Sequence, residues 1–377
     1  MIRLFRPTFD VEACLDELRD CLESGWTGPG FKTDALEKEW KEYTGLPNAY
    51  YVNSCTAALN LTFDIFKQVY NWQDGDEVIS TPVTFVSSNH AILLAGLHPV
   101  FADIDDTLCL DPVDVEKKIT EKTRAVLMVG IGGNPGNYEQ ILELCRKHDL
   151  KLVIDAAHMA GTKVDGKFPC MDADAVCFSF HVFKTLATAD SGMLCLKDAE
   201  QDKLARIKAW SGINTAAFSD VAIADHKTYK WHYDVPYVSS CYNGNSIMAA
   251  VALAQLRCLD KDNERRREIC AKYDEAFSKC PNVQLIRYAD NCESSRCLYQ
   301  IIVEDRDGLV KYLNAHDINS GVHYVNNTNY RMYAYGKNTC PRAEYYSEHM
   351  ITLPIHLRLT DEEVEYVIKT VLDFVNK

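Results

Sequence analysis

Residues 150–161, LKLVIDAAHMAG, carry the pattern from which we predict the fold of this chain. The first half of this segment is an almost continuous apolar run that ends in Asp155, which is typical of a strand buried on both faces. Such strands belong to parallel sheets whose two faces are covered by crossover helices. Comparable runs occur along the chain on either side of it, at residues 49–53, 77–80, 98–103, 123–129 and 173–178.

The segments between these runs have the length and apolar spacing of helices. Residues 56–70, 113–119 and 138–148 are predicted to be helical. Strands that alternate with helices in this way indicate an α/β fold. We therefore predict a mixed, mostly parallel central sheet with flanking helices.

The pattern changes near residue 246. Residues 246–280 form one helical pattern of about 35 residues, which is much longer than an average helix and suits a link between domains. After it, short strands are predicted at residues 283–288 and 298–303, and helices at residues 306–315 and 361–375. We predict a large domain over residues 1–245, and a small α+β domain with its linking helix over residues 246–377.

Composition excludes several classes of protein. With 47% hydrophobic and 25% charged residues among 377, the chain is neither disordered nor of low complexity. The net charge of −14 argues against a protein that binds a nucleic-acid polymer through its phosphates. An anionic substrate would need a local basic pocket.

The fifteen cysteines are scattered singly, and no C-x-x-C pair occurs, so we predict neither a metal site nor a disulfide framework. The first residues, MIRLFRPTFDVEAC, contain no apolar run of signal-peptide length. The longest apolar stretch, residues 91–101, is interrupted by Gly96, His98 and Pro99. We expect a cytoplasmic protein with reduced thiols and no membrane segment.

Two residues at predicted strand ends suggest a chemistry. Asp155 ends one strand, and Lys184 follows the strand at residues 173–178. Functional groups gather at the carboxyl ends of strands in open α/β sheets, so the two side chains can face one cleft. Pyridoxal phosphate requires an Asp beside its ring nitrogen and a Lys that forms a Schiff base. Taken alone, the pair also fits a turn-forming Asp and a solvated Lys.

Longer motifs resemble the DegT-type family of pyridoxal phosphate-dependent sugar aminotransferases. The resemblance runs along nearly the whole chain and implies a fold-type I transferase that works as a homodimer. Gly321, Val322, His323 and Tyr324, with His356 and Arg358, resemble its perosamine synthase-like branch. The matching segments are SGWTGPGFKTDALEKEWKEYTG (24–45), NSCTAALNL (53–61), DGDEVISTPVTFVSSNHAILLAGLHPVFADID (74–105), VIDAAHMAG (153–161), CFSFHVFKTLATADSGML (177–194) and LPIHLRLTDEEV (353–364).

The resemblance implies a role for four residues around the cofactor ring. Lys184 resembles the Schiff-base lysine that also moves the proton, and Asp155 resembles the partner of the pyridine nitrogen. His158 stands where the family places a polar side chain near the phenolic oxygen, with a packed core histidine as the alternative. Phe85 stands where an aromatic group stacks on the ring, with core packing as the alternative.

Four further residues are implied near the cofactor phosphate. Ser54, Cys55 and Thr56 begin a predicted helix, whose unpaired N–H groups suit an anion. Simple capping of the helix is the alternative for all three. Ser179 matches a family serine that reaches the same phosphate.

The chain also departs from the family pattern. The Asn that reaches the partner subunit's phosphate falls on Cys241, which leaves Asn243 or Asn245 as its replacement, with Asn245 as the predicted ligand. Residues 130–134, GIGGN, stand in place of a His-x-x-Gly pattern, so a polar contact is expected to be missing. His181, His323 and Tyr324 are predicted to face the substrate, with structural roles equally open.

The function implied is transfer of an amino group from L-glutamate, through pyridoxal and pyridoxamine phosphate, to a keto group. The acceptor implied is a nucleoside-diphosphate-linked deoxyhexose, and a 4-keto-6-deoxy sugar is the first candidate among these. A sugar dehydratase on the same fold is one alternative, although such relatives carry His in place of the Lys that is present here. A non-catalytic sensor is another, although Asp155 and Lys184 are both present.

Overall fold

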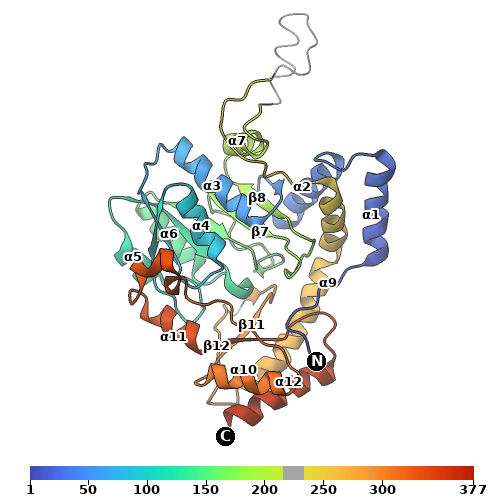
Figure 1. Ribbon diagram of the computed structural model, residues 1–377, viewed down its shortest axis with the longest axis vertical. Helices are drawn as coiled ribbons and strands as arrows, with labels where there is room; N and C mark the ends of the chain where they lie inside the picture. The colour runs from blue at the N-terminus through green and yellow to red at the C-terminus, as the bar shows by residue number, and fades with distance from the viewer. Residues whose placement is uncertain (215–232, 290) are drawn as a thin grey trace, which may run out of the picture.

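The computed structural model describes residues 1–214, 233–289 and 291–377 (Figure 1). Its centre is a seven-stranded sheet in the order β1-β8-β7-β5-β4-β2-β3. Strands β7, β5, β4, β2 and β3 run parallel, whereas β8 is antiparallel to both of its neighbours. The predicted mixed, mostly parallel sheet is confirmed. Its strands are β1 (Tyr50–Val52), β2 (Glu77–Ser80), β3 (His98–Phe101), β4 (Thr123–Val129), β5 (Lys151–Asp155), β7 (Ala175–Ser179) and β8 (Gly192–Leu196).

Helices cover both faces of this sheet. One apolar core joins the sheet to α3, α4 and α7, and a second joins it to α2, α5, α6 and α9. In β5, Val153 enters the first core while Leu152 and Ile154 enter the second, which explains the unbroken apolar run. The helices are α1 (Val11–Ser24), α2 (Phe31–Thr44), α3 (Cys55–Val69), α4 (Val86–Leu94), α5 (Pro112–Lys118), α6 (Tyr138–Lys147), α7 (Ala199–Ala209) and α9 (Ser246–Phe277).

A third apolar core lies around the C-terminal sheet, whose strand order is β12-β11-β9. Helix α9 ends at Phe277, three residues before the predicted end, and the predicted strand at 283–288 is reduced to β9. The elements here are β9 (Gln284–Leu285), β11 (Tyr299–Ile302), β12 (Met350–Leu353), α10 (Arg306–Ala315), α11 (Pro341–His349) and α12 (Asp361–Val375). Short elements are β6 (Lys163–Val164), β10 (Cys292–Glu293), η1 (Ile131–Gly133), η2 (Asn327–Asn329) and η3 (Arg331–Gly336).

Two features connect this C-terminal part to the rest of the chain. The later residues of α9, including Tyr273, pack in the C-terminal core, whereas its earlier residues, including Leu253, pack against the central sheet. The N-terminal residues also lie here, since Ile2 pairs with Ile318, and both chain ends lie near α12 in Figure 1. The domain division at residues 245 and 246 stays a prediction.

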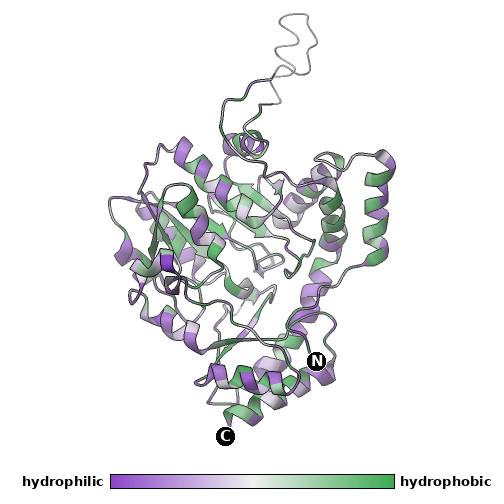
Figure 2. Ribbon diagram, viewed as in Figure 1, coloured by the Kyte–Doolittle hydropathy of each residue, from purple (hydrophilic) through white to green (hydrophobic). Residues whose placement is uncertain are grey.

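The surface and core differ as expected for a folded globule. Figure 2 shows the strands of the central sheet as mainly hydrophobic and the flanking helices as mixed. No helix among residues 1–214, 233–289 and 291–377 is both long enough and apolar enough to span a bilayer. Within the same described ranges, no group of three His, Cys, Asp or Glu side chains could hold a metal ion.

Gly192, the first residue of β8, is predicted to be essential for packing the sheet against α3. An added Cβ would lie 2.6 Å from the carbonyl oxygen of Phe178 and 2.7 Å from the amide nitrogen of Cys55. We expect Gly192→Ala to lower the free energy of unfolding by about 1–3 kcal/mol, because backbone atoms on both sides must move. Urea unfolding followed by tryptophan fluorescence measures this change. Gly28→Ala, whose Cβ meets no atom within 4 Å, is the control, and equal midpoints for both variants would contradict the packing account.

Candidate active site

A cavity of about 450 Å³ opens at the carboxyl ends of β5 and β7. Open α/β sheets bind ligands at this edge, because strand ends and helix starts meet there. The predicted site residues line this cavity, with the exception of Asn245. These residues are Ser54, Cys55, Thr56, Phe85, Asp155, His158, Ser179, His181, Lys184, His323 and Tyr324.

Asp155 ends β5 and is only 4% exposed. Its Oδ2 accepts a hydrogen bond from the Ser88 hydroxyl at 2.7 Å, and its Oδ1 accepts one from the Ala157 amide at 3.1 Å. Burial raises the pKa of Asp155, whereas these hydrogen bonds and the charge of Lys184 act in the opposite direction. The result is a fixed, poorly hydrated carboxylate that would gain from a cationic partner in the cavity.

Lys184 lies in the loop after β7 and is half-buried in the cavity wall. Its own amide donates to the carbonyl oxygen of His181 at 2.8 Å, which forms a tight turn. Burial is the main cause of the lowered pKa of both His158 and His323, and the positive charge of Lys184 is the second cause. Lys184 and Asp155 line one cavity, as the strand-end argument predicted, and His158 and His323 line it as well.

The proton on His158 is placed by its two hydrogen-bond partners. Nδ1 of His158 accepts from the Gly132 amide at 3.2 Å, so the ring proton resides on Nε2 of the neutral imidazole. Nε2 lies 3.2 Å from the Tyr324 hydroxyl, and burial keeps His158 neutral by lowering its pKa. His158 thus donates to the Tyr324 oxygen, which leaves the Tyr324 hydroxyl hydrogen available to a ligand. Burial also raises the pKa of Tyr324, so that hydrogen is retained.

The sequence predicts that residues 130–134 lack a polar side-chain contact. In the structure this loop supplies a backbone contact, from the Gly132 amide to Nδ1 of His158. Gly132 and Gly133 adopt φ values of +63° and +89°, which favour glycine. The Ser294 hydroxyl donates to the Gly133 carbonyl oxygen at 3.0 Å, and the Ser295 hydroxyl donates to that of His158 at 2.5 Å. A Cβ on Gly133 would lie 2.2 Å from the Ser295 oxygen, so the close approach needs glycine.

The start of α3 supplies the cavity with a helix N-terminus. The Ser54 hydroxyl oxygen accepts from the Ala57 amide at 3.1 Å, so Ser54 caps the helix. The Cys55 thiol lies 3.8 Å from Oδ1 of Asp155 and donates to the Cys177 carbonyl oxygen at 3.5 Å, which directs it into the protein. What this helix start offers an anion is therefore chiefly its backbone N–H groups.

Four more residues complete the wall. Phe85 is 57% exposed although it lines the cavity, so its ring face is free to stack on a flat ligand. Ser179 is buried at the end of β7, where its hydroxyl oxygen accepts from the His181 amide at 3.3 Å. Nδ1 of His323 lies 3.0 Å from the Thr352 hydroxyl, and burial followed by the Lys184 charge lowers the pKa of His323 to about 4.

The asparagines considered as partner-subunit ligands lie outside this cavity. Oδ1 of Asn245 accepts from the Met248 amide at 2.9 Å and caps α9. Oδ1 of Asn243 accepts a hydrogen bond from the Tyr50 hydroxyl. Because the predicted contact is with a second subunit, the role of Asn245 stays a prediction.

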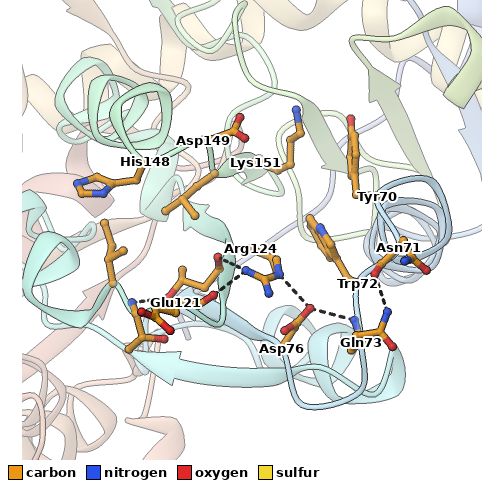
Figure 3. A pocket seen from close by; sticks show the side chains of 14 residues that line it. Tyr70, Asn71, Trp72, Gln73, Asp76, Glu121, Arg124, His148, Asp149 and Lys151 are labelled. Atoms are coloured by element: carbon orange, nitrogen blue, oxygen red, sulfur yellow. Dashed lines mark hydrogen bonds and ion pairs between the residues drawn. The ribbon is translucent and has the colours of Figure 1, made fainter.

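A larger open pocket of about 1040 Å³ lies at the opposite edge of the sheet (Figure 3). It is formed where β2, β4 and β5 begin, and none of the predicted site residues lines it. Nε of Arg124 donates to Oδ2 of Asp76 at 2.9 Å, and the Lys151 ammonium lies 4.6 Å from the centre of the Tyr70 ring. Arg124 and Lys151 are thus each engaged with a neighbouring side chain of the pocket.

The neutral histidines predict how stability depends on pH. With a folded pKa of about 4 against an ordinary value of 6.5, His323 binds its proton more readily in the unfolded chain, so acidification from pH 6.5 towards 4 favours unfolding. We expect His323→Gln in the ligand-free protein to recover roughly 1–3 kcal/mol of that loss. The raised pKa of Asp155 changes the pH dependence of stability in the opposite direction. Because Asp155 is present in both proteins, its contribution cancels when the two are compared.

Urea unfolding at several pH values measures the difference between wild type and His323→Gln. His98→Gln, at an exposed position, is the matched control. Parallel stability curves for wild type and His323→Gln between pH 4 and 6.5 would contradict the burial of a neutral imidazole.

Comparison with known proteins agrees with this geometry. Residues 9–372 match the model of the DegT/DnrJ/EryC1/StrS aminotransferase family. The chain is 32% identical to the spore coat polysaccharide biosynthesis protein SpsC of Bacillus subtilis, over 96% of this chain and 94% of SpsC. It is also 32% identical to the dTDP-4-dehydro-2,3,6-trideoxy-D-glucose 4-aminotransferase of Saccharopolyspora spinosa, over 97% of this chain and 95% of that enzyme.

Solved structures agree in fold and in cofactor. The PMP form of the putative sugar aminotransferase Spr1654 from Streptococcus pneumoniae has a TM-score of 0.90 and 31% identity, over 99% of this chain and 98% of that one. The PLP form of the same protein has a TM-score of 0.88 and 30% identity, with the same coverage.

The residues described above fit pyridoxal phosphate. The buried Asp155 carboxylate suits a protonated ring nitrogen, the exposed Phe85 face suits a flat ring, and the start of α3 suits a phosphate. Lys184 is the amine in the same cavity. The chain belongs to the DegT/DnrJ/EryC1/StrS aminotransferase family and is a pyridoxal phosphate-dependent sugar aminotransferase.

Proposed function

We propose that this enzyme moves an amino group from L-glutamate to the keto group of a nucleoside-diphosphate-linked 4-keto-6-deoxyhexose. The observation that carries the proposal is that Lys184 and the buried Asp155 line one cavity. The name of the Saccharopolyspora spinosa relative supports the acceptor, because it describes amination at position 4 of a nucleotide-linked dehydro sugar. A lysine at position 184 favours transamination, because the sugar dehydratases of this fold carry His at that position.

Lys184 and Asp155 divide the work in this proposal. When bound, pyridoxal phosphate withdraws electrons from the carbon that carries the amino group. Nζ of Lys184 takes the proton from that carbon when glutamate gives up its amino group. In the second half of the reaction, Nζ of Lys184 gives a proton to the carbon of the sugar that receives the amino group. Asp155 stays ionised against a positive ring nitrogen, with the Ser88 hydroxyl and the Ala157 amide fixing the carboxylate.

The remaining wall residues orient ligands. Phe85 supports the flat ring, and the amide groups at the start of α3 together with Ser179 hold the phosphate. The Tyr324 hydroxyl, turned outward by the His158 proton, donates to an oxygen of the bound ligands. His181 and His323 face the sugar or the amino donor.

The proposed enzyme is a homodimer in the cytoplasm and belongs to the perosamine synthase-like branch. Asn245 of one subunit would reach the phosphate held by the other, and the cavity would be closed at the subunit boundary. In each subunit, residues 1–245 bind the cofactor and residues 246–377 cap the cavity.

Replacing Lys184 tests the proposed reaction. We expect Lys184→Ala to lower the rate of amino transfer at least about 100-fold, because the group that moves the proton is lost, while nucleotide-sugar binding persists. Lys151→Ala, in the pocket at the opposite edge of the sheet, is the control. Mass spectrometry of products from a panel of nucleotide-linked keto-sugars with glutamate measures the rate. Near wild-type transfer by Lys184→Ala would exclude the proposed role, and loss of water in place of amine gain by the wild type would support the dehydratase.

Replacing Phe85 tests the stacking role separately from chemistry. We expect Phe85→Ala to weaken binding of pyridoxamine phosphate, which needs no bond to Lys184, by roughly 3-fold to 10-fold. Phe85→Tyr keeps the ring and should bind as wild type does. Titration followed by protein fluorescence gives the dissociation constants, and equal values for Phe85→Ala and wild type would rule out stacking.

A further inference from the structure

A smaller pocket of about 170 Å³ lies outside the 450 Å³ cavity and shares no lining residue with it, although Arg6 and His356 also line a narrow pocket that includes Lys184. It is formed by the first residues of the chain, by the segment after β12 and by α12. The side chains that concern us are those of Arg3, Arg6, His356, Arg358 and Glu363.

Backbone pairing brings these distant residues together. The Ile2 amide donates to the Asp317 carbonyl oxygen at 2.7 Å, and the Ile355 amide donates to the Leu4 carbonyl oxygen at 3.3 Å. Side chains alternate along an extended chain, so Arg3 lies on the opposite side from Ile2 and Leu4 and is exposed. The N-terminal segment is thereby held beside the segment that follows β12.

The pocket concentrates positive charge in a chain whose net charge is −14. Within the part of the chain that the structure describes, Arg3, Arg6 and Arg358 form no ion pair, whereas arginines elsewhere contact carboxylates. The one acidic residue of the pocket is Glu363, whose Oε2 accepts from the Thr360 amide at 3.0 Å as a helix cap. Three guanidinium groups are therefore opposed by one carboxylate that is already engaged.

The pocket wall also contains a polar atom without a partner. His356 is only 6% exposed, and its Nδ1 has no hydrogen-bond partner among the described residues. Buried polar atoms are nearly always hydrogen-bonded, so each exception calls for an explanation. The imidazole of His356 already meets the backbone of Arg3. A ligand oxygen drawn to this wall by the arginines accepts from Nδ1 of His356 when the ring proton lies on that nitrogen.

We propose that this pocket binds a small oxyanion, a phosphate or carboxylate group, through Arg3, Arg6 and Arg358 with His356 behind them. Guanidinium groups suit such anions because their N–H donors match two oxygens at once. The volume is below the roughly 300–1,000 Å³ of pockets for whole small molecules, so the pocket takes a free ion or one charged end of a larger ligand. This site does not depend on the reaction proposed above.

Calorimetric titration of the pyridoxal phosphate-loaded protein tests the site, because the cofactor then occupies its own phosphate position. Inorganic phosphate and malonate are the two probes, and the tighter one shows whether phosphate or carboxylate is preferred. We expect one saturable site per chain, about tenfold weaker in Arg358→Gln and weaker still in the Arg3→Gln, Arg6→Gln double variant. Arg19→Gln, which removes an exposed charge on α1, should bind as wild type does.

A second measurement separates loss of the site from loss of folding. Phosphate should raise the melting temperature of wild type and of Arg19→Gln equally, raise that of Arg358→Lys less, and raise that of Arg358→Gln least. Each protein is compared with itself, so a lower starting stability does not obscure the result. The absence of saturable binding of both probes, or equal binding by wild type and Arg358→Gln, would overturn the proposal.

Discussion

The carboxylate of Asp155 is buried at the end of a strand, and the active site depends on how its charge is held there. An isolated carboxylate in such surroundings is unfavourable, which is why burial raises its pKa. A hydroxyl from α4, an amide from the turn after β5 and the charge of Lys184 each lower that cost. The order of strands in the sheet and the start of α3 are what bring these groups to one point.

A second set of contacts joins the C-terminal part of the chain to this site. Ser294 and Ser295 hold the glycine loop after β4 and the backbone of His158, and the Gly132 amide in turn places the proton of His158. That proton orients Tyr324, which comes from the C-terminal part. These hydrogen bonds thus link the C-terminal part of the chain to the large sheet and back to the cavity, so this wall of the cavity is assembled only when both parts are folded.

Much of this could be predicted from sequence, because parallel strands leave apolar runs and strand ends collect functional groups. Asp155, His158, Lys184 and Phe85 line one cavity as expected. The contribution of Ser88 could not be predicted, because α4 buries polar residues and lacks the apolar spacing of a surface helix. The Gly132 amide leaves no side-chain signal, and Ser294 and Ser295 are remote in sequence. Cys55 lines the cavity as predicted, but its thiol is directed into the protein, towards the Cys177 carbonyl oxygen and Asp155.

We propose that Lys184 is the amine that bonds the cofactor beside Asp155. The most direct test is to reduce the pyridoxal phosphate-loaded enzyme with borohydride, digest it and map the modified lysine by mass spectrometry. We expect the reduced cofactor to be attached to Lys184, and Asp155→Ala to weaken cofactor retention while Lys184 remains the attachment point. Attachment to a different lysine, or no attachment in an enzyme that still transfers amino groups, would contradict this proposal.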